Sequence, residues 1–494
     1  MSGPLGDPRR VVVVGGGITG LSAAHRLHEL IAEGGLRASV LLLESAPTLG
    51  GHVRTEVVDG HLFEGGPDSL VLAKPAGRAL CERLGLGDDL VRVEGGRIQI
   101  LHRGRLRDVP EGFRMMAPTR LGPVLSSSLF SPAGKVRMAM ERFLPAAPPE
   151  RDESLGAFVT RRFGREVLER VAEPILASLF VADADRLSLG ATLPQFHEME
   201  RRHGSVTRAF AAARRDRRRI EGRHDARSSN VASLRNGFGR IVETLTARLP
   251  VDSVRTRIRI DRIDAPPESD RWRIELADSD PVTADAVILA CPAYAMASVL
   301  ASVDAGLAAE LDRVDYAPCA TVNLAYRADD IGRMPGSVGF FVARTERRPL
   351  LAVSFVSVKF PERAPAGRIL LRAFLGGALH PEVEELDEDA LARVAHDELV
   401  PLLRLRGTPV LARTYRFPRA MPQYEVGFPA RLESIAARAE AIPGLVLAGS
   451  AVGAVGLPDC IASGERAAEV AAGFVTTLRP PPAVVLGAGA VERY

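Results

Sequence analysis

The sequence predicts an α/β protein in which both ends of the chain contribute to one parallel sheet. Residues 11–14 are four consecutive valines, followed by a glycine-rich turn and a stretch typical of a helix. A second unit of this type lies near the other end of the 494-residue chain, with an apolar strand at 445–448 followed by a turn and a helix. Alternating apolar and polar residues at 97–107 and several strand-like stretches at 318–377 predict a second, mixed sheet between these units.

The first turn has the spacing G-x-G-x-x-G, formed by Gly15, Gly17 and Gly20. In this arrangement Gly15 permits the tight turn, Gly17 allows the backbone to approach a pyrophosphate, and Gly20 allows the helix to pack closely on the strand. The N–H groups at the start of the helix, near Ile18 and Thr19, favour phosphates. We therefore predict a Rossmann-like dinucleotide-binding domain rather than a purely structural turn.

Two features further along strengthen this prediction. The apolar strand 40–43 ends in Glu44, whose carboxylate can accept hydrogen bonds from a ribose, although a surface glutamate would look the same. Gly50 and Gly51 form a second glycine pair, followed by Arg54, in a loop that can also approach the dinucleotide. At this point NAD and FAD fit the motif equally well.

The other elements are predicted from local patterns along the chain. Pro75 begins a helix that Gly85 ends. Arg103 and Gly104 form the turn of a hairpin over 97–107. Further strands are expected at 254–263, 272–276, 286–290, 321–326, 338–342, 350–357 and 369–375, and an acidic helix is expected within 381–405.

These elements predict three domains, two of them discontinuous. The dinucleotide-binding domain comprises 1–95, 226–300 and 431–494. A mixed-sheet domain, inserted into it, comprises 96–110 and 301–430, and a helical domain comprises 111–225. The helical domain mixes apolar and basic residues, as at Lys135–Met138, and contains an arginine run at 214–219. It is expected either to contact a bilayer surface or to be an ordinary helical subdomain.

Composition limits the classes of function. The chain is 46% hydrophobic and 25% charged, with a net charge of +3, so it is globular and has no general affinity for nucleic acid. Its four cysteines (Cys81, Cys291, Cys319, Cys460) are widely spaced, which predicts free thiols in a reducing compartment and no metal site. No apolar run approaches the roughly 18 residues of a membrane span, and no secretory signal is expected.

Several motifs together identify a family resemblance. The segment Gly15–Ala24, with Glu44 and Leu49–Gly51, is similar to the flavoprotein superfamily of amine oxidases, phytoene desaturases and protoporphyrinogen oxidases. Motifs elsewhere resemble those of the oxygen-dependent protoporphyrinogen oxidases, over nearly the whole chain. They lie at 64–69, 152–155, 161–166, 360–365, 421–424 and 456–464.

The resemblance implies FAD, bound in two halves. The opening turn would bind the adenine-side phosphates, and the N-terminus of the last helix, at Gly456 and Leu457, would stabilise negative charge on the reduced flavin. The implied cofactor-binding residues are Gly15, Gly17, Ile18, Thr19, Gly20, Glu44, Ser45, Gly50, Gly51, Arg54, Gly66, Pro67, Asp68, Ser69, Ile258, Ala290, Gly449, Ser450, Val455, Gly456 and Leu457.

The implied reaction oxidises a porphyrinogen to a porphyrin in haem biosynthesis, in three two-electron steps. A hydride passes from a meso carbon to flavin N5, and O2 is reduced to H2O2; no protein side chain is implied as a certain catalytic group. Arg97 would bind a propionate, and Phe360 would stack on a pyrrole ring, although a surface arginine and a core phenylalanine are the alternatives. Val342 would form the opposite wall, and Ser178 would lie near the reacting carbon.

The leading substrate is protoporphyrinogen IX. Coproporphyrinogen III, with four propionates instead of two, stays open and would be favoured by more cationic side chains around the cavity. An amine oxidase would need an aromatic cage, and the only tryptophan, Trp272, is poorly placed for one. Departures from the family pattern at Ser178, Ser450, Val452 and Phe428 also leave a catalytically silent flavoprotein open.

The resemblance further implies a cytoplasmic location, with or without peripheral contact at the inner face of the plasma membrane. A contact with a ferrochelatase-type enzyme is a further implied partner. Monomer and homodimer both remain open.

Overall fold

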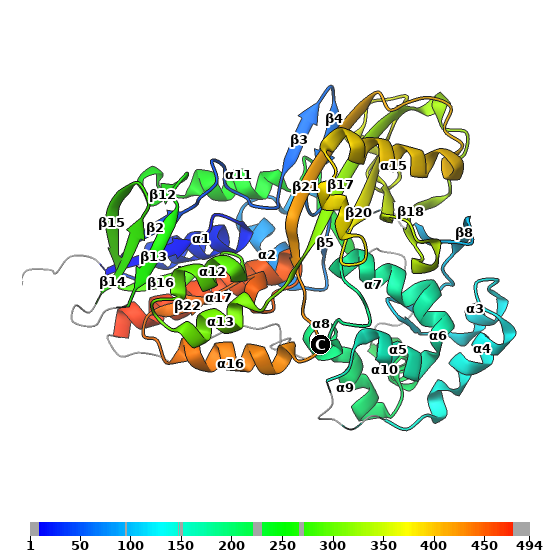
Figure 1. Ribbon diagram of the computed structural model, residues 1–494, viewed down its shortest axis with the longest axis horizontal. Coiled ribbons are helices and arrows are strands. Elements are labelled where there is room, and N and C mark those ends of the chain that lie inside the picture. The colour runs from blue at the N-terminus through cyan, green and yellow to red at the C-terminus, as the bar shows by residue number, and fades with distance from the viewer. Residues whose placement is uncertain are drawn as a thin grey trace, which may run out of the picture.

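The computed structural model describes residues 9–93, 96–146, 148, 152–220, 230–265 and 271–477. These residues form an α/β architecture with a parallel sheet and its helices on one side, a large mixed sheet above, and a group of helices below that sheet (Figure 1). This agrees with the predicted fold class.

The parallel sheet has five strands in the order β12-β2-β1-β16-β22, taken from three separate stretches of the chain. Alternate valines of β1 face opposite cores, since Val11 and Val13 pack with the helices α1 and α17, whereas Val12 and Val14 pack against the other face. A central parallel strand that is buried on both faces explains the unbroken apolar run. The bounds are β12 (Val254–Arg255), β2 (Ala38–Leu43), β1 (Arg9–Val14), β16 (Ala286–Leu289), β22 (Leu445–Leu447), α1 (Ile18–Ala32) and α17 (Leu457–Thr477).

The expectation of one strand over 254–263 is wrong. Val254 and Arg255 extend the edge of the parallel sheet beside β2, whereas β13 (Ile260–Asp264) belongs to a three-stranded antiparallel sheet with β14 (Trp272–Leu276) and β15 (Ser279–Ala284). The break lies at Arg257, whose φ of 60° is left-handed. A left-handed residue cannot continue a strand, and the alternation of apolar residues does not reveal it.

The large sheet has seven strands in the order β21-β17-β20-β19-β18-β7-β8, antiparallel except for the β18–β7 pair. It contains the predicted hairpin as β7 and β8 and the four predicted strands of the 318–377 stretch. The bounds are β21 (Leu411–Pro422), β17 (Tyr316–Arg327), β20 (Arg368–Gly376), β19 (Leu350–Phe355), β18 (Ser337–Val342), β7 (Arg97–His102) and β8 (Arg105–Asp108).

Sequence patterns missed the long strand β21. It contains Pro418 and ends at Pro422, and proline disfavours a strand because it cannot donate to the ladder. The structure accommodates Pro418 because β21 lies at the edge of the sheet and its pairing with β17 shifts register between Ala317 and Cys319. The predicted acidic helix is shorter than expected, since α15 spans Glu388–Leu403.

The helical part contains α3 to α10 and the π-helical turn η3. A fully buried arginine, Arg162, organises its core by pairing with Glu141 and Glu200. The bounds are α3 (Leu121–Ser126), α4 (Pro132–Ala139), η2 (Met140–Phe143), α5 (Leu155–Phe163), α6 (Arg165–Val167), η3 (Leu168–Ala172), α7 (Glu173–Phe180), α8 (Leu189–Thr192), α9 (Pro194–His203) and α10 (Val206–Ile220).

The remaining elements connect these parts. Two of the small sheets are β3–β4 and β9–β10, and the third has the order β5-β11-β6. The bounds are β3 (Thr55–Val58), β4 (His61–Glu64), β5 (Leu70–Val71), β6 (Leu90–Arg92), β9 (Phe113–Arg114), β10 (Ala117–Pro118), β11 (Val231–Leu234), α2 (Pro75–Arg83), α11 (Gly239–Arg248), α12 (Ala293–Leu300), α13 (Ala305–Asp312), α14 (Val356–Lys359) and α16 (Phe428–Glu440).

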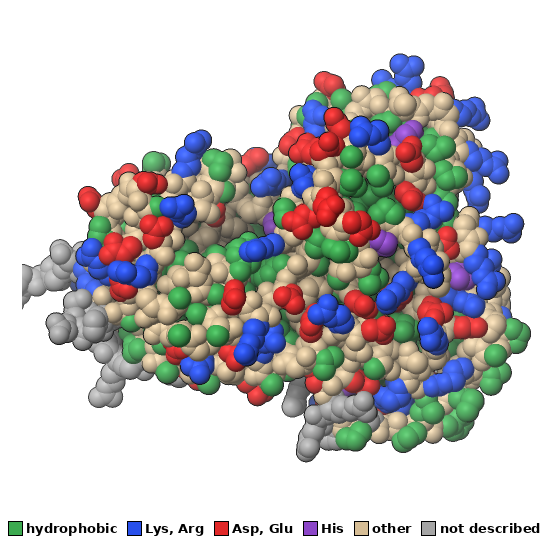
Figure 2. Space-filling view, viewed as in Figure 1, with side chains coloured by type: hydrophobic (Ala, Val, Ile, Leu, Met, Phe, Trp, Pro, Cys, Tyr) green, Lys and Arg blue, Asp and Glu red, His purple; other side chains and the backbone are tan. Residues whose placement is uncertain are grey.

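Exposed hydrophobic side chains gather over α3, α4 and η2, at the right-hand edge of Figure 2. They are Leu125, Val136, Met140 and Phe143, of which Phe143 is 81% exposed. Among the described residues, no helix combines the length and the apolar character that a bilayer crossing requires. Peripheral contact between this surface and lipid stays a prediction.

Candidate cofactor and substrate site

The turn between β1 and α1 is tightly packed on one side and open on the other. Gly15 has a φ of 107°, and a Cβ added to it would lie 2.6 Å from the carbonyl oxygen of Ala290. A Cβ on Gly20 would overlap the carbonyl of Gly15. In contrast, a Cβ on Gly17 would meet no atom within 4 Å. Gly17 lies immediately before Ile18 and Thr19, which begin α1, so the open side faces the free N–H groups of the helix.

Glu44 is held against this turn by its own carboxylate. Its Oε2 accepts a hydrogen bond from the N–H of Gly16 at 2.5 Å, and Oε1 accepts from the N–H of Ala46 at 2.6 Å and from the hydroxyl of Ser45 at 3.2 Å. Ile258 also contacts this strand end, because its N–H donates to the carbonyl of Glu44 at 2.9 Å. The carboxylate has further lone-pair positions with which it can accept ribose hydroxyls.

The second glycine pair lies directly beside the first turn. The N–H of Gly50 donates to the carbonyl of Gly16 at 2.8 Å, and Gly51 approaches so closely that an added Cβ would lie 3.3 Å from the Cα of Gly17. Arg54 donates to the carbonyl of Gly51 at 3.3 Å. The structure thus brings the two predicted glycine loops together.

The late cofactor segment packs on the same turn. A Cβ on Gly464 of α17 would overlap the carbonyl of Thr19, and the N–H of Gly449 donates to the hydroxyl of Ser463 at 2.9 Å. At the start of α17, Gly456 has a φ of 83°, and a Cβ there would meet no atom within 4 Å. Openness at Gly17 and Gly456, beside close packing at the other glycines, fits a dinucleotide that runs from one helix N-terminus to the other.

Sequence reasoning did not identify Tyr424 as the support of the 450–456 loop. Its side chain is 1% exposed, its hydroxyl donates to the carbonyl of Ser450, and its ring stacks on Phe428 with centroids 4.3 Å apart. Burial raises the pKa of the Tyr424 hydroxyl well above its ordinary value, so the group stays a donor. The replacement at Phe428 therefore serves packing against Tyr424. Val455, in the same loop, is half-buried.

The segment Gly66–Ser69 is fixed by charged side chains of the large sheet. Lys359 pairs with Asp68 at 2.8 Å, and Arg372 donates to the carbonyls of Gly65 and Gly66. Burial opposes the charge on Asp68, but Lys359 and Arg372 outweigh it and hold its pKa well below the usual range. Neither basic residue was predicted. The only local signal is an arginine inside the buried apolar strand β20.

The structure separates the four predicted substrate residues. Ser178 of α7 donates to the carbonyl of Leu351 at 3.0 Å, and Leu351 lines a pocket together with Val342. Phe360 packs in a different cluster, with the guanidinium of Arg363 4.2 Å above its ring. Arg97 is at the far end of the β18–β7 pair from Val342, is exposed, and pairs with Asp108 at 3.0 Å. Their roles stay predictions.

The chain matches the family model for flavin containing amine oxidoreductase over residues 18–472. It is 31% identical to coproporphyrinogen III oxidase of Bacillus subtilis, over 93% of this chain and 97% of that protein. It is 33% identical to coproporphyrinogen III oxidase of Propionibacterium freudenreichii, over 94% of this chain and 91% of that protein. Chloroplastic protoporphyrinogen oxidase of Nicotiana tabacum is 26% identical, over 94% and 86%.

A solved structure gives the same picture. The crystal structure of a protein from Exiguobacterium sp. 255-15, assigned as a protoporphyrinogen oxidase, has a TM-score of 0.81 and 30% identity, covering 93% of this chain and 98% of that one. The agreement extends through the parallel sheet, the mixed sheet and the helical part.

Proposed function

The chain belongs to the flavin-containing amine oxidoreductase family, and from this premise we propose that it oxidises coproporphyrinogen III to coproporphyrin III. The observation that carries the proposal is the identity of 31% and 33% to two coproporphyrinogen III oxidases, over at least 93% of the chain. The tobacco protoporphyrinogen oxidase is 26% identical over a similar span. Protoporphyrinogen IX, which the motifs favoured, becomes the second candidate, supported by the Exiguobacterium structure.

The overall reaction removes six electrons and six protons from the macrocycle in three equal steps. FAD, when bound, supplies the hydride acceptor at N5, and each pair of electrons then reduces one O2 to H2O2. The protein's own contribution is mainly positioning, because aromatisation of the product already drives the reaction. The N-termini of α1 and α17, with open space at Gly17 and Gly456, would hold the two ends of the cofactor.

Amine oxidation has less support from the site. The single tryptophan, Trp272, is 1% exposed, lies on β14, and donates from its indole to the carbonyl of Pro443 at 3.2 Å. It is therefore a core residue of the three-stranded sheet, with no part in an aromatic cage around a flavin.

The test compares substrates on the purified, flavin-loaded protein in air. We expect porphyrin fluorescence to grow faster on coproporphyrinogen III than on protoporphyrinogen IX, with about one H2O2 formed per two electrons removed. Protein freed of flavin corrects for spontaneous oxidation. Faster growth on protoporphyrinogen IX would establish the second candidate. No growth on either substrate, with flavin bound, would leave a silent flavoprotein.

A further inference from the structure

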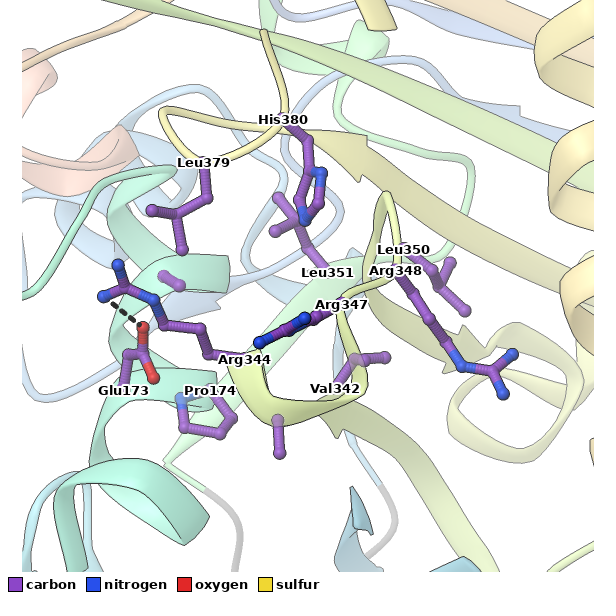
Figure 3. A pocket seen from close by; sticks show the side chains of 12 residues that line it. Glu173, Pro174, Val342, Arg344, Arg347, Arg348, Leu350, Leu351, Leu379 and His380 are labelled. Carbon is purple, nitrogen blue, oxygen red and sulfur yellow. Dashed lines mark hydrogen bonds and ion pairs between the residues drawn. The ribbon is translucent and has the colours of Figure 1, made fainter. Parts of the chain in front are cut away.

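A pocket of about 210 Å³ opens where α7 meets the turn between β18 and β19. Figure 3 shows the side chains that line it, which come from the start of α7, from both strand ends and from Leu379 and His380. The volume is below the roughly 300 Å³ of pockets that hold a whole drug-sized ligand. It therefore fits one substituted ring of a larger molecule rather than an entire tetrapyrrole.

The pocket combines an apolar wall with a cationic rim. Its wall contains Pro174, Ala177, Val342 and Leu351, whereas the connecting turn supplies three arginines within five residues. A ligand with an apolar body and a terminal carboxylate has both parts satisfied by such a lining.

Two of these arginines already have acidic partners. Arg344 pairs with Glu173 at 3.3 Å and Asp183 at 3.4 Å, and Arg348 pairs with Glu398 at 2.5 Å. In the part of the chain that the structure describes, no ion pair is found for Arg347. Its side chain is exposed and lies between the Glu173–Arg344 pair and His380 in Figure 3. Arg347 is therefore the cation of this rim that is free to receive an external carboxylate.

The pocket is connected to the predicted reaction site by a hydrogen bond. The hydroxyl of Ser178 donates to the carbonyl of Leu351 at 3.0 Å, and the preceding residue, Ala177, lines the pocket. A macrocycle whose reacting carbon lies near Ser178 would therefore extend a peripheral ring toward Arg347.

We propose that this pocket binds one propionate-bearing ring of the porphyrinogen, with Arg347 as the carboxylate-binding residue that favours four propionates over two. The inference rests on the proposed function, because it assigns a specificity role within that reaction. A vinyl group at the same place would leave Arg347 hydrated and unpaired, so the ring would lose a charge-assisted hydrogen bond and nothing more.

The test changes the charge of the pocket in both directions. Arg347→Ala should raise KM for coproporphyrinogen III by about tenfold, leave kcat unchanged, and leave KM for protoporphyrinogen IX within about twofold. Glu173→Gln removes the negative charge nearest the rim and should lower KM for coproporphyrinogen III. Arg393→Ala, an exposed arginine of α15 that does not line the pocket, should change neither value.

A binding measurement separates this inference from the proposed function. The Kd of coproporphyrin III, followed by its fluorescence, should rise about tenfold in Arg347→Ala, and that of protoporphyrin IX should not. If the wild type oxidises coproporphyrinogen III and both the KM and the Kd ignore Arg347, the pocket inference is wrong and the function stands. If the wild type oxidises neither porphyrinogen, the proposed function is wrong, and an unchanged Kd in Arg347→Ala also overturns the pocket.

Discussion

The buried guanidinium of Arg372 donates from Nη2 to the carbonyl oxygen of Gly65 at 3.1 Å, across an interval of 307 positions in the chain. A second bond from the same nitrogen goes to the carbonyl of Gly66. Arg372 is 1% exposed, and its guanidinium also lies 4.7 Å from the ring of Phe374. The large sheet thereby fixes the backbone of the segment predicted to contact the cofactor.

Arg372→Met should weaken flavin retention. The change removes the two donors from the Gly65 and Gly66 carbonyls and one of the two cations near Asp68, so the Gly66–Ser69 segment loses its fixed position. We expect the ratio of flavin to protein absorbance after gel filtration to fall several-fold, by roughly the effect of 1–3 kcal/mol. Arg368→Met, at the partly exposed start of the same strand, is the matched control. Equal flavin content in both variants would contradict the prediction.

Local patterns predicted the parts of this protein whose function follows from adjacent residues. The glycine turn, Glu44 and the last helix could be recognised because strand, turn and helix N-terminus are consecutive in the chain. Arg372 and Lys359 could not, because their partners lie about 290 to 307 positions away and no local pattern encodes such a pairing. A charged residue inside the apolar strand β20 was the one available signal.

The same reasoning explains why the substrate residues were less predictable than the cofactor residues. Val342 and Ser178 come together only because β18, β19 and α7 meet at one place. Arg347, in a connecting turn rich in arginines, is indistinguishable from its neighbours in the sequence. Only the ion pairs of Arg344 and Arg348 in the structure set it apart.

Gly464→Ala should destabilise the contact between α1 and α17. An added Cβ would overlap the carbonyl of Thr19 and lie 3.2 Å from the N–H nitrogen of Ala23, so the two helices would have to separate. Overpacking should cost about 2 kcal/mol of unfolding free energy and reduce flavin content, despite the better helix propensity of alanine. Urea unfolding followed by circular dichroism measures the first effect.

Gly473→Ala in the same helix is the control for that experiment. A Cβ there would meet no atom within 4 Å, so the gain in helix propensity should appear alone, at up to about 1 kcal/mol of added stability. If both variants change stability in the same direction and by the same amount, close packing of α17 on α1 is not what requires glycine at position 464.

Arg162→Met should be the most damaging of the substitutions considered. The guanidinium is fully buried and pairs with Glu141 and Glu200, and Glu141 also accepts hydrogen bonds from Ser205 and Thr207. Removing the cation leaves these carboxylates buried without compensation, which costs about 3–5 kcal/mol. Thermal unfolding of the helical part should show it. Arg165→Ala removes an 82% exposed partner of Glu169 and should cost about 0.5 kcal/mol or less. Comparable losses would mean that the buried network does not support the helical core.

Glu173→Gln should make the protein more stable at high pH than at low pH, relative to wild type. Burial raises the pKa of Glu173 to about 7, against the opposing effect of Arg344. The folded state therefore binds more protons than the unfolded state between the ordinary value of 4.5 and about 7, so wild-type stability falls as pH rises through this window. Below the window the carboxyl is neutral in both states and the two proteins should unfold alike. Above it the variant should gain up to about 3 kcal/mol. Urea unfolding at pH 4.5, 6 and 8 measures the difference, with Glu433→Gln, an exposed carboxyl of α16, as the control that should stay flat. A difference that is constant with pH would show that Glu173 is already ionised in the folded protein at low pH, held by its pair with Arg344.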